Sequence, residues 1–196
     1  MNKFEFPVAV YGNIEKYNDV LSKARCRIFY KYGNRNGTYI TDEFAEKLLK
    51  TLPYAPVKGI YEYDDYTDHG SRRSEGRIYG IVPENPNISW EPHLDEDGVE
   101  RTYACADVLI FTALYAEAGD IVGKSQSMEL YEPSLKYHQA IYDGQKFIVF
   151  DEGCFLGLQV LGDDVEPCFE SASFFELQTS IDKVIKKIQE IEAIYT

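Results

Sequence analysis

The sequence predicts one β-dominated α+β domain, whose strands form a small closed or partly open β-barrel flanked by helices. The first observation is that short segments rich in branched and aromatic side chains recur at close spacing, bounded by Gly, Asp and Asn. The second is that clear helical periodicity is confined to a few segments. The third is size, because 196 residues with 44% hydrophobic side chains suit a single packed core.

Two strand candidates, a turn and a helix open the chain. Residues 4–11 and 24–32 are rich in aromatic and branched side chains, and the NRNG at residues 34–37 is a turn signal. Residues 41–53 then place apolar side chains four apart, with Thr41 able to cap the first turn. This spacing predicts a short amphipathic helix.

The region from residue 57 to residue 101 is expected to be rich in loops. Residues 57–80 hold two alternating aromatic segments around a polar stretch, which predicts a strand, an exposed loop and a strand. Residues 83–101 contain three prolines and a DG turn, which predicts a long loop held down by Trp90.

The second half of the chain predicts a β meander. Residues 105–123 indicate a buried strand through Thr112 followed by a helix. After Gly123, four short strand candidates follow one another at close spacing, bounded by Gly and Asp.

The C-terminal segment differs in kind, because its apolar residues alternate four and three apart. This spacing is typical of a coiled-coil stripe, or of a helix that lies against its own domain. The residues are Leu177, Ile181, Val184, Ile188, Ile191 and Tyr195. We therefore divide the chain into a main domain, residues 1–175, and a C-terminal amphipathic helix, residues 176–196.

Composition excludes several classes of function. The formal net charge of −13 repels phosphate and anionic lipid, so neither nucleic acid nor a membrane is expected as a partner. The first twelve residues are too short and too polar for a signal peptide, and no apolar run is long enough to cross a bilayer, so a cytoplasmic location is expected. The four cysteines form no CxxC pair, and no cofactor is expected.

The residues that could carry chemistry form a short list, because the chain has only three histidines. His69 follows an acidic stretch between two strand candidates, where a loop can present it. In GKSQSMELY, strand alternation places Ser127 and Glu129 on one face. A serine hydroxyl attacks a peptide only with a base and a group that orients the base, so Ser127, His69 and an acid form a candidate set.

The identity of the acid is open at this point. Glu129 is the first choice by its position on the strand, and Asp151, Glu152 and His138 are the alternatives. Two acidic stretches that contain His69 and His93 lack the ligand ladder of a calcium loop, and the chain has no HExxH motif. We interpret them as solvated loops and expect no metal site.

Several stretches together resemble the prohead protease family of tailed bacteriophages. They are FYKYGNRNGTYITDEFAEKLLKTLPYAPVKGIY, DHG, GRIYGIVPENPNISWE, DEDGVERTYACADVLIFTALYAEA, GKSQSMELY and FLGLQVLGDDVEPCFESASFF. They spread over roughly residues 26–175, far more than a single motif covers.

The resemblance implies a fold related to herpesvirus assemblin, with the catalytic histidine and serine on neighbouring strands. The histidine corresponds to His69 in DHG and the nucleophile to the serine of the SME motif, Ser127, with Ser125 as its nearest rival. Assemblin uses a second histidine and an arginine pair near its oxyanion site. This chain has no histidine at the matching point after Ser127, and its LGDDVEP segment carries acids instead of arginines.

The function that the resemblance implies is a serine endopeptidase that cleaves scaffold and capsid precursors, and itself, inside the assembling procapsid in the host cytoplasm. Its substrates would be the phage scaffold protein and the major capsid protein precursor, and the C-terminal helix would pair protomers or lead into a scaffold segment. The alternative is a non-catalytic scaffold or capsid-binding module of the procapsid on the same fold.

Overall fold

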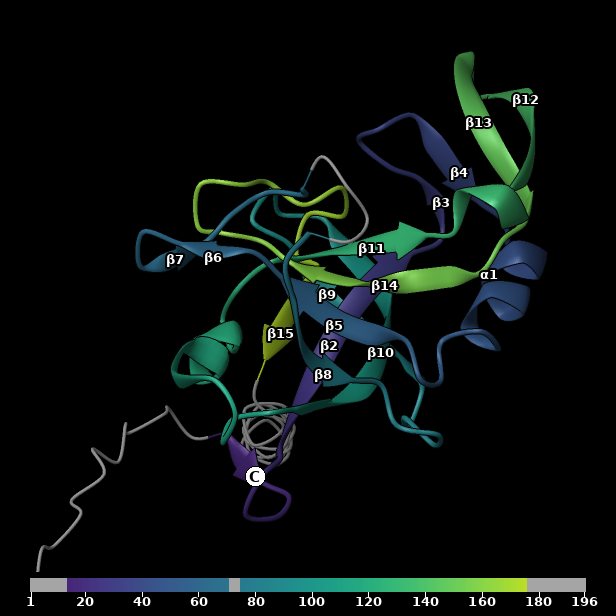
Figure 1. The fold of residues 1–196 in the computed structure, drawn as a ribbon. Coiled ribbons are helices and arrows are strands. Elements are labelled where there is room, and N and C mark those ends of the chain that lie inside the picture. The colour runs from purple at the N-terminus through teal and green to yellow at the C-terminus, as the bar shows by residue number, and fades with distance from the viewer. Residues whose placement is uncertain (1–13, 71–74, 176–196) are drawn as a thin grey trace, which may run out of the picture.

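The computed structural model describes residues 14–70 and 75–175 (Figure 1). The strand predicted at residues 4–11 and the helix predicted at residues 176–196 lie outside the described residues, so the predicted boundary between the two parts of the chain stays a prediction.

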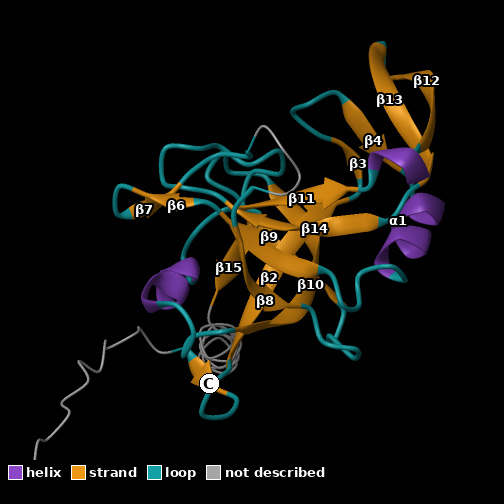
Figure 2. Cartoon of the chain, in the orientation of Figure 1, coloured by secondary structure: helices purple, strands orange, loops and turns teal. Residues whose placement is uncertain are grey.

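Strands dominate the described part of the chain, as the sequence predicts (Figure 2). The strands are β1 (Glu15–Lys16), β2 (Ser22–Tyr30), β3 (Tyr32–Gly33), β4 (Thr38–Ile40), β5 (Pro56–Gly59), β6 (Tyr61–Glu62), β7 (Asp65–Tyr66), β8 (Arg77–Ile81), β9 (Ser89–Leu94), β10 (Glu100–Ile110), β11 (Gln126–Leu130), β12 (Lys136–Tyr142), β13 (Gln145–Glu152), β14 (Phe155–Val160) and β15 (Ser173–Phe175). The helices are α1 (Asp42–Leu49) and two short 3-10 helices, η1 (Ala116–Ile121) and η2 (Glu132–Ser134).

The main sheet has nine strands, in the order β1-β2-β10-β8-β5-β14-β11, with β15 also paired to β2 and β9 to β10. It is not a closed barrel, so the closed form of the prediction is wrong. The two ends of the sheet meet at an isolated bridge between Ser125 and Ser173. Backbone hydrogen bonds flank this bridge, from Gln126 N–H to the carbonyl of Ala172 and from Phe174 N–H to that of Lys124. The Gln126 side chain adds a further link, because its Nε2 donates to the carbonyl of Ile28 at 2.7 Å.

A smaller sheet, in the order β12-β13-β4-β3, projects from one end of the molecule (Figure 1). The β12–β13 hairpin is an insertion between β11 and β14, which pair with each other, and β14 runs parallel to β5. The predicted meander is therefore wrong. The sequence shows which segments are extended, but the long-range partner of each strand depends on which pairing buries its apolar face.

Two other predicted segments differ from the structure. The region predicted as a long loop contains β9, which pairs with the first half of β10. Trp90 holds this strand to the core by an edge-on contact with Phe29, with ring centroids 5.8 Å apart. After the β10 strand ends at Ile110, the predicted helix is the short 3-10 helix η1.

The helix α1 confirms the helix predicted within residues 41–53, but it ends at Leu49 rather than at Pro53. Thr41 Oγ1 accepts a hydrogen bond from the backbone N–H of Phe44 at 3.1 Å, which caps the first turn. Phe44 and Leu48 are buried, and the Phe44 ring contacts that of Phe150 on β13. The helix thus covers the junction between the main sheet and the projecting hairpin.

Within residues 14–70 and 75–175, no helix is long and apolar enough to span a membrane.

Candidate active site

The candidate site lies on one face of three neighbouring strands of the main sheet, β5, β14 and β11. Side chains on these strands alternate between two faces. One face carries Val57, Leu158 and Val160, which are fully buried in the core. The opposite face carries polar groups, and the strand register aligns Ser127, Gln159 and Lys58 in one row across the three strands.

His69 reaches this polar face from the loop between β7 and β8. Its Nδ1 lies 3.0 Å from Oε1 of Glu129 on β11, sixty residues away in sequence. The Asp68 carboxylate accepts a hydrogen bond from the backbone N–H of His69 at 2.7 Å, which helps to fix the loop at this point. The histidine is on a loop rather than on a neighbouring strand, which differs from the arrangement that the prohead protease resemblance implies.

Ser127 precedes Glu129 by two positions on β11, so the two side chains share a face, as predicted. Two residues of strand span about 6.7 Å. An imidazole with a hydrogen bond at each of its nitrogens needs a similar span between its partners. With Nδ1 directed at Glu129, Nε2 is the nitrogen that can serve Ser127. No hydrogen bond joins Ser127 to His69 among the described residues, so the two would have to approach for reaction.

Lys58 is a third partner that sequence analysis missed. Its Nζ lies 2.6 Å from Oε2 of Glu129, and its side chain is only 13% exposed. Glu129 Oε2 is buried and receives no well-directed hydrogen bond from the described residues, so the attraction between Lys58 and Oε2 is mainly electrostatic. Little in the sequence distinguishes Lys58, because a lysine on a short strand usually points into solvent.

Opposing effects act on the Glu129 carboxylate. Burial raises its pKa, while the contacts with His69 and Lys58 lower it, and the net pKa is below the usual value. The carboxylate is therefore ionised at neutral pH, which is the state that can hold the N–H of an imidazole.

The alternative acids lie elsewhere. Asp151 contacts His138 at 2.8 Å, and Glu152 contacts Lys136 at 2.8 Å, both on the projecting hairpin. Of the four groups considered, Glu129 is the one that contacts His69. The rival nucleophile, Ser125, lies just before β11 at the bridge to Ser173.

A cavity of about 730 Å³ is lined in part by Asp68, the residue before His69. Its lining includes five acidic residues, namely Glu62, Asp65, Asp68, Asp164 and Glu166. Lys124 offsets part of this charge, because its Nζ lies 2.6 Å from Asp65 and 2.8 Å from Asp163. In the described portion of the chain, no group of three or more His, Cys, Asp or Glu side chains is arranged to hold a metal ion.

The domain described above is a β-rich module, and its candidate site combines a serine, a histidine and a carboxylate. The family model of the YonD N-terminal domain matches residues 20–193, so the chain belongs to this family. The family is phage-associated, and the match carries no indication of a prohead protease or of an assemblin relative. No curated protein and no solved structure matches the chain.

Proposed function

We propose that the protein is a serine endopeptidase of a tailed bacteriophage, with Ser127 as nucleophile, His69 as general base and Glu129 as the acid that orients the base. The observation that carries this proposal is the 3.0 Å contact between His69 Nδ1 and Glu129 Oε1, two residues along the strand from Ser127.

In the proposed reaction, His69 Nε2 takes the proton of Ser127 Oγ as the oxygen attacks the scissile carbonyl. Glu129 accepts the N–H at Nδ1, which holds the tautomer that leaves Nε2 free as a base. His69 then gives the proton to the leaving amine, and water releases the acyl group from Ser127 by the reverse sequence.

We further propose the substrates that the prohead protease resemblance implies, the scaffold and major capsid precursors inside the procapsid, together with self-cleavage. The net charge of −13 and the acidic cavity lined by Asp68 favour basic segments of such substrates. As part of the same proposal, the β-rich fold is a partly open barrel of the assemblin type.

A fluorophosphonate probe tests the nucleophile without knowledge of the substrate, because it labels serines that a neighbouring base activates. We expect wild-type protein to be labelled at Ser127, found by peptide mass spectrometry, and Ser127→Ala to lose the label. Ser125→Ala tests the rival nucleophile, which lies just before β11, and Ser134→Ala is a control in the 3-10 helix η2.

Incubation with a scaffold or capsid precursor then tests the reaction. Cleavage by wild type, absent in folded Ser127→Ala and His69→Ala, supports the endopeptidase. If wild type and both variants bind the precursor and leave it equally intact, the protein is a non-catalytic procapsid module.

A further inference from the structure

We propose that Lys58 is a positioning residue of the His69–Glu129 pair, an inference that rests on the proposed function. The Glu129 carboxylate lies between an imidazole and an ammonium group, with His69 Nδ1 at 3.0 Å from Oε1 and Lys58 Nζ at 2.6 Å from Oε2. Each oxygen thus has its own partner. Lys58 fixes the oxygen that the histidine does not use, so the carboxylate cannot rotate away from the imidazole.

The sheet is built so that Lys58 can reach this position. β14 lies between β5, which carries Lys58, and β11, which carries Glu129. The residue of β14 opposite Glu129 is Gly157. A Cβ at Gly157 would lie 3.0 Å from the carbonyl oxygen of Pro56 and 3.7 Å from Cδ of Lys58. The tight approach at Gly157 is to Pro56, and the lysine stem passes this glycine at ordinary van der Waals distance on its way to Glu129.

Burial gives this contact its strength. The Lys58 side chain is 13% exposed and that of Glu129 is 18% exposed. A lysine and a glutamate on a solvated surface contribute little, but a pair screened this far from water interacts more strongly, and removal of one partner leaves the other charge uncompensated. Lys58 is thus too well buried to be an ordinary surface lysine.

The charged groups around the His69 imidazole determine how the loss of Lys58 would affect its protonation. They are Glu129 from β11, Lys58 from β5, Asp68 from the histidine's own loop, and Glu75, which packs against the backbone position Gly70. Lys58 is the described cation that contacts Glu129 beside the histidine. Without Lys58, the negative charge of Glu129 is no longer offset by a neighbouring cation. This charge then favours the protonated imidazole, which cannot act as a base.

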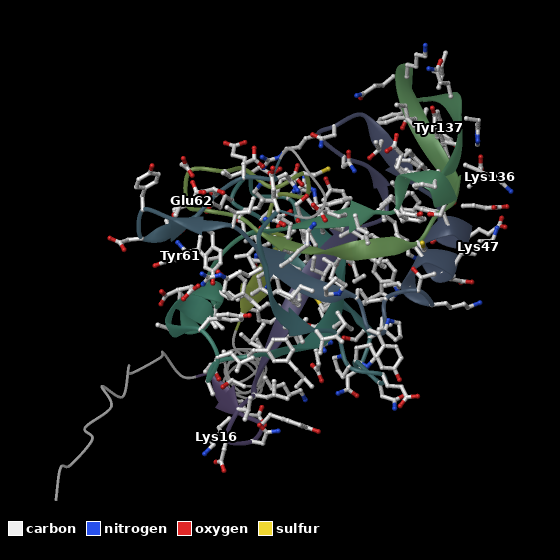
Figure 3. The ribbon with its side chains drawn as sticks, viewed as in Figure 1. Lys16, Lys47, Tyr61, Glu62, Lys136 and Tyr137 are labelled. Carbon is white, nitrogen blue, oxygen red and sulfur yellow. The ribbon has the colours of Figure 1, made fainter. Side chains whose placement is uncertain are left out.

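The test compares Lys58→Met, which keeps the apolar stem, with Lys58→Arg, which keeps the charge. For Lys58→Met we expect kcat/KM to fall about 10- to 100-fold, mainly through kcat. The acid limb of its pH profile should move up by roughly one pH unit. Lys58→Arg should restore most of both. Lys136→Met is the control, since it removes a lysine from an ion pair on the projecting hairpin (Figure 3).

A readout independent of activity separates this inference from the proposed function. The His69 imidazole can be titrated by NMR in wild type and in each variant, with His69→Gln assigning its signal. We expect its titration midpoint to rise in Lys58→Met, to return in Lys58→Arg and to stay unchanged in Lys136→Met. If wild type is inactive but the midpoint moves, the proposed function fails and the coupling stands. If the enzyme is active and Lys58→Met changes neither the pH profile nor the midpoint, the role of Lys58 is wrong.

Discussion

Two histidine–carboxylate pairs are seen among the described residues, and they share a contact through Nδ1 but differ in burial and surroundings. His69 and Glu129 are 3.0 Å apart at the main sheet, and His138 and Asp151 are 2.8 Å apart on the projecting hairpin. In the hairpin pair both side chains are half exposed, at 54% and 50%, whereas Glu129 is 18% exposed and has Lys58 as a second partner. A short distance therefore does not identify a site, because exposed pairs form readily and gain little.

The surroundings distinguish the two pairs. The main-sheet pair lies two residues along the strand from Ser127, and its carboxylate is held from both sides. The hairpin pair lies at the surface of the hairpin that also carries a second exposed pair, Lys136 and Glu152. We infer that chemistry belongs to the pair with restricted water access and a neighbouring hydroxyl.

The largest expected effect comes from removing each histidine in turn. His69→Gln should reduce precursor cleavage about 1,000-fold or more, because the base is lost. His138→Gln should leave the rate about unchanged. Initial cleavage rates of the two folded variants, checked by circular dichroism, give the comparison. Equal losses in both would show that neither pair acts as the base.

A smaller effect is expected from the two carboxylates. In Glu129→Gln, an amide faces the His69 imidazole and the Lys58 ammonium. If the amide oxygen accepts from His69, the amide NH2 group points at the ammonium, to which it cannot bond, so the imidazole is held poorly. We expect kcat/KM to fall about 100-fold. Asp151→Asn is the matched variant on the hairpin and should act like wild type. A wild-type cleavage rate for Glu129→Gln would show that the acid that orients His69 is one of the other candidates, Asp151, Glu152 or His138.

The smallest effect concerns stability in acid. The pKa of Glu129 is lower in the folded protein than its ordinary value of 4.5. Ionised Glu129 therefore stabilises the fold above that ordinary value, and the contribution is lost as the pH falls through the lower folded pKa. Between pH 6 and pH 3, the unfolding free energy of wild type should fall by up to about 1 kcal/mol more than that of Glu129→Gln.

Urea denaturation at a series of pH values measures this difference, with Asp151→Asn as the control. Parallel pH curves for wild type and Glu129→Gln would contradict the stabilising role of the buried contacts.

Local chemistry made part of this molecule predictable. The Thr41 cap and the four-residue spacing of Phe44 and Leu48 defined α1 before any tertiary contact was known. The alternation in SQSMELY placed Ser127 and Glu129 on one face, because side-chain direction in a strand follows from position alone. The β-dominated class followed from the same patterns.

Long-range pairing was not predictable in this way. The meander failed because β11 and β14 pair across an inserted hairpin, and the long loop failed because β9 has its partner in β10. The strands β9, β11 and β14 are only five or six residues long, so the sequence of each specifies an extended conformation but not the strand that will cover its edge.

The sequence alone thus determined the class of the fold, the helix at residues 42–49 and the side-by-side placement of a serine and a glutamate on one strand. Only the tertiary structure decided that His69 meets Glu129 rather than Asp151, and that Lys58 crosses Gly157 to reach the same carboxylate. The physical reason is that such contacts depend on strand order and register, which are set by burial of the whole sheet rather than by neighbouring residues.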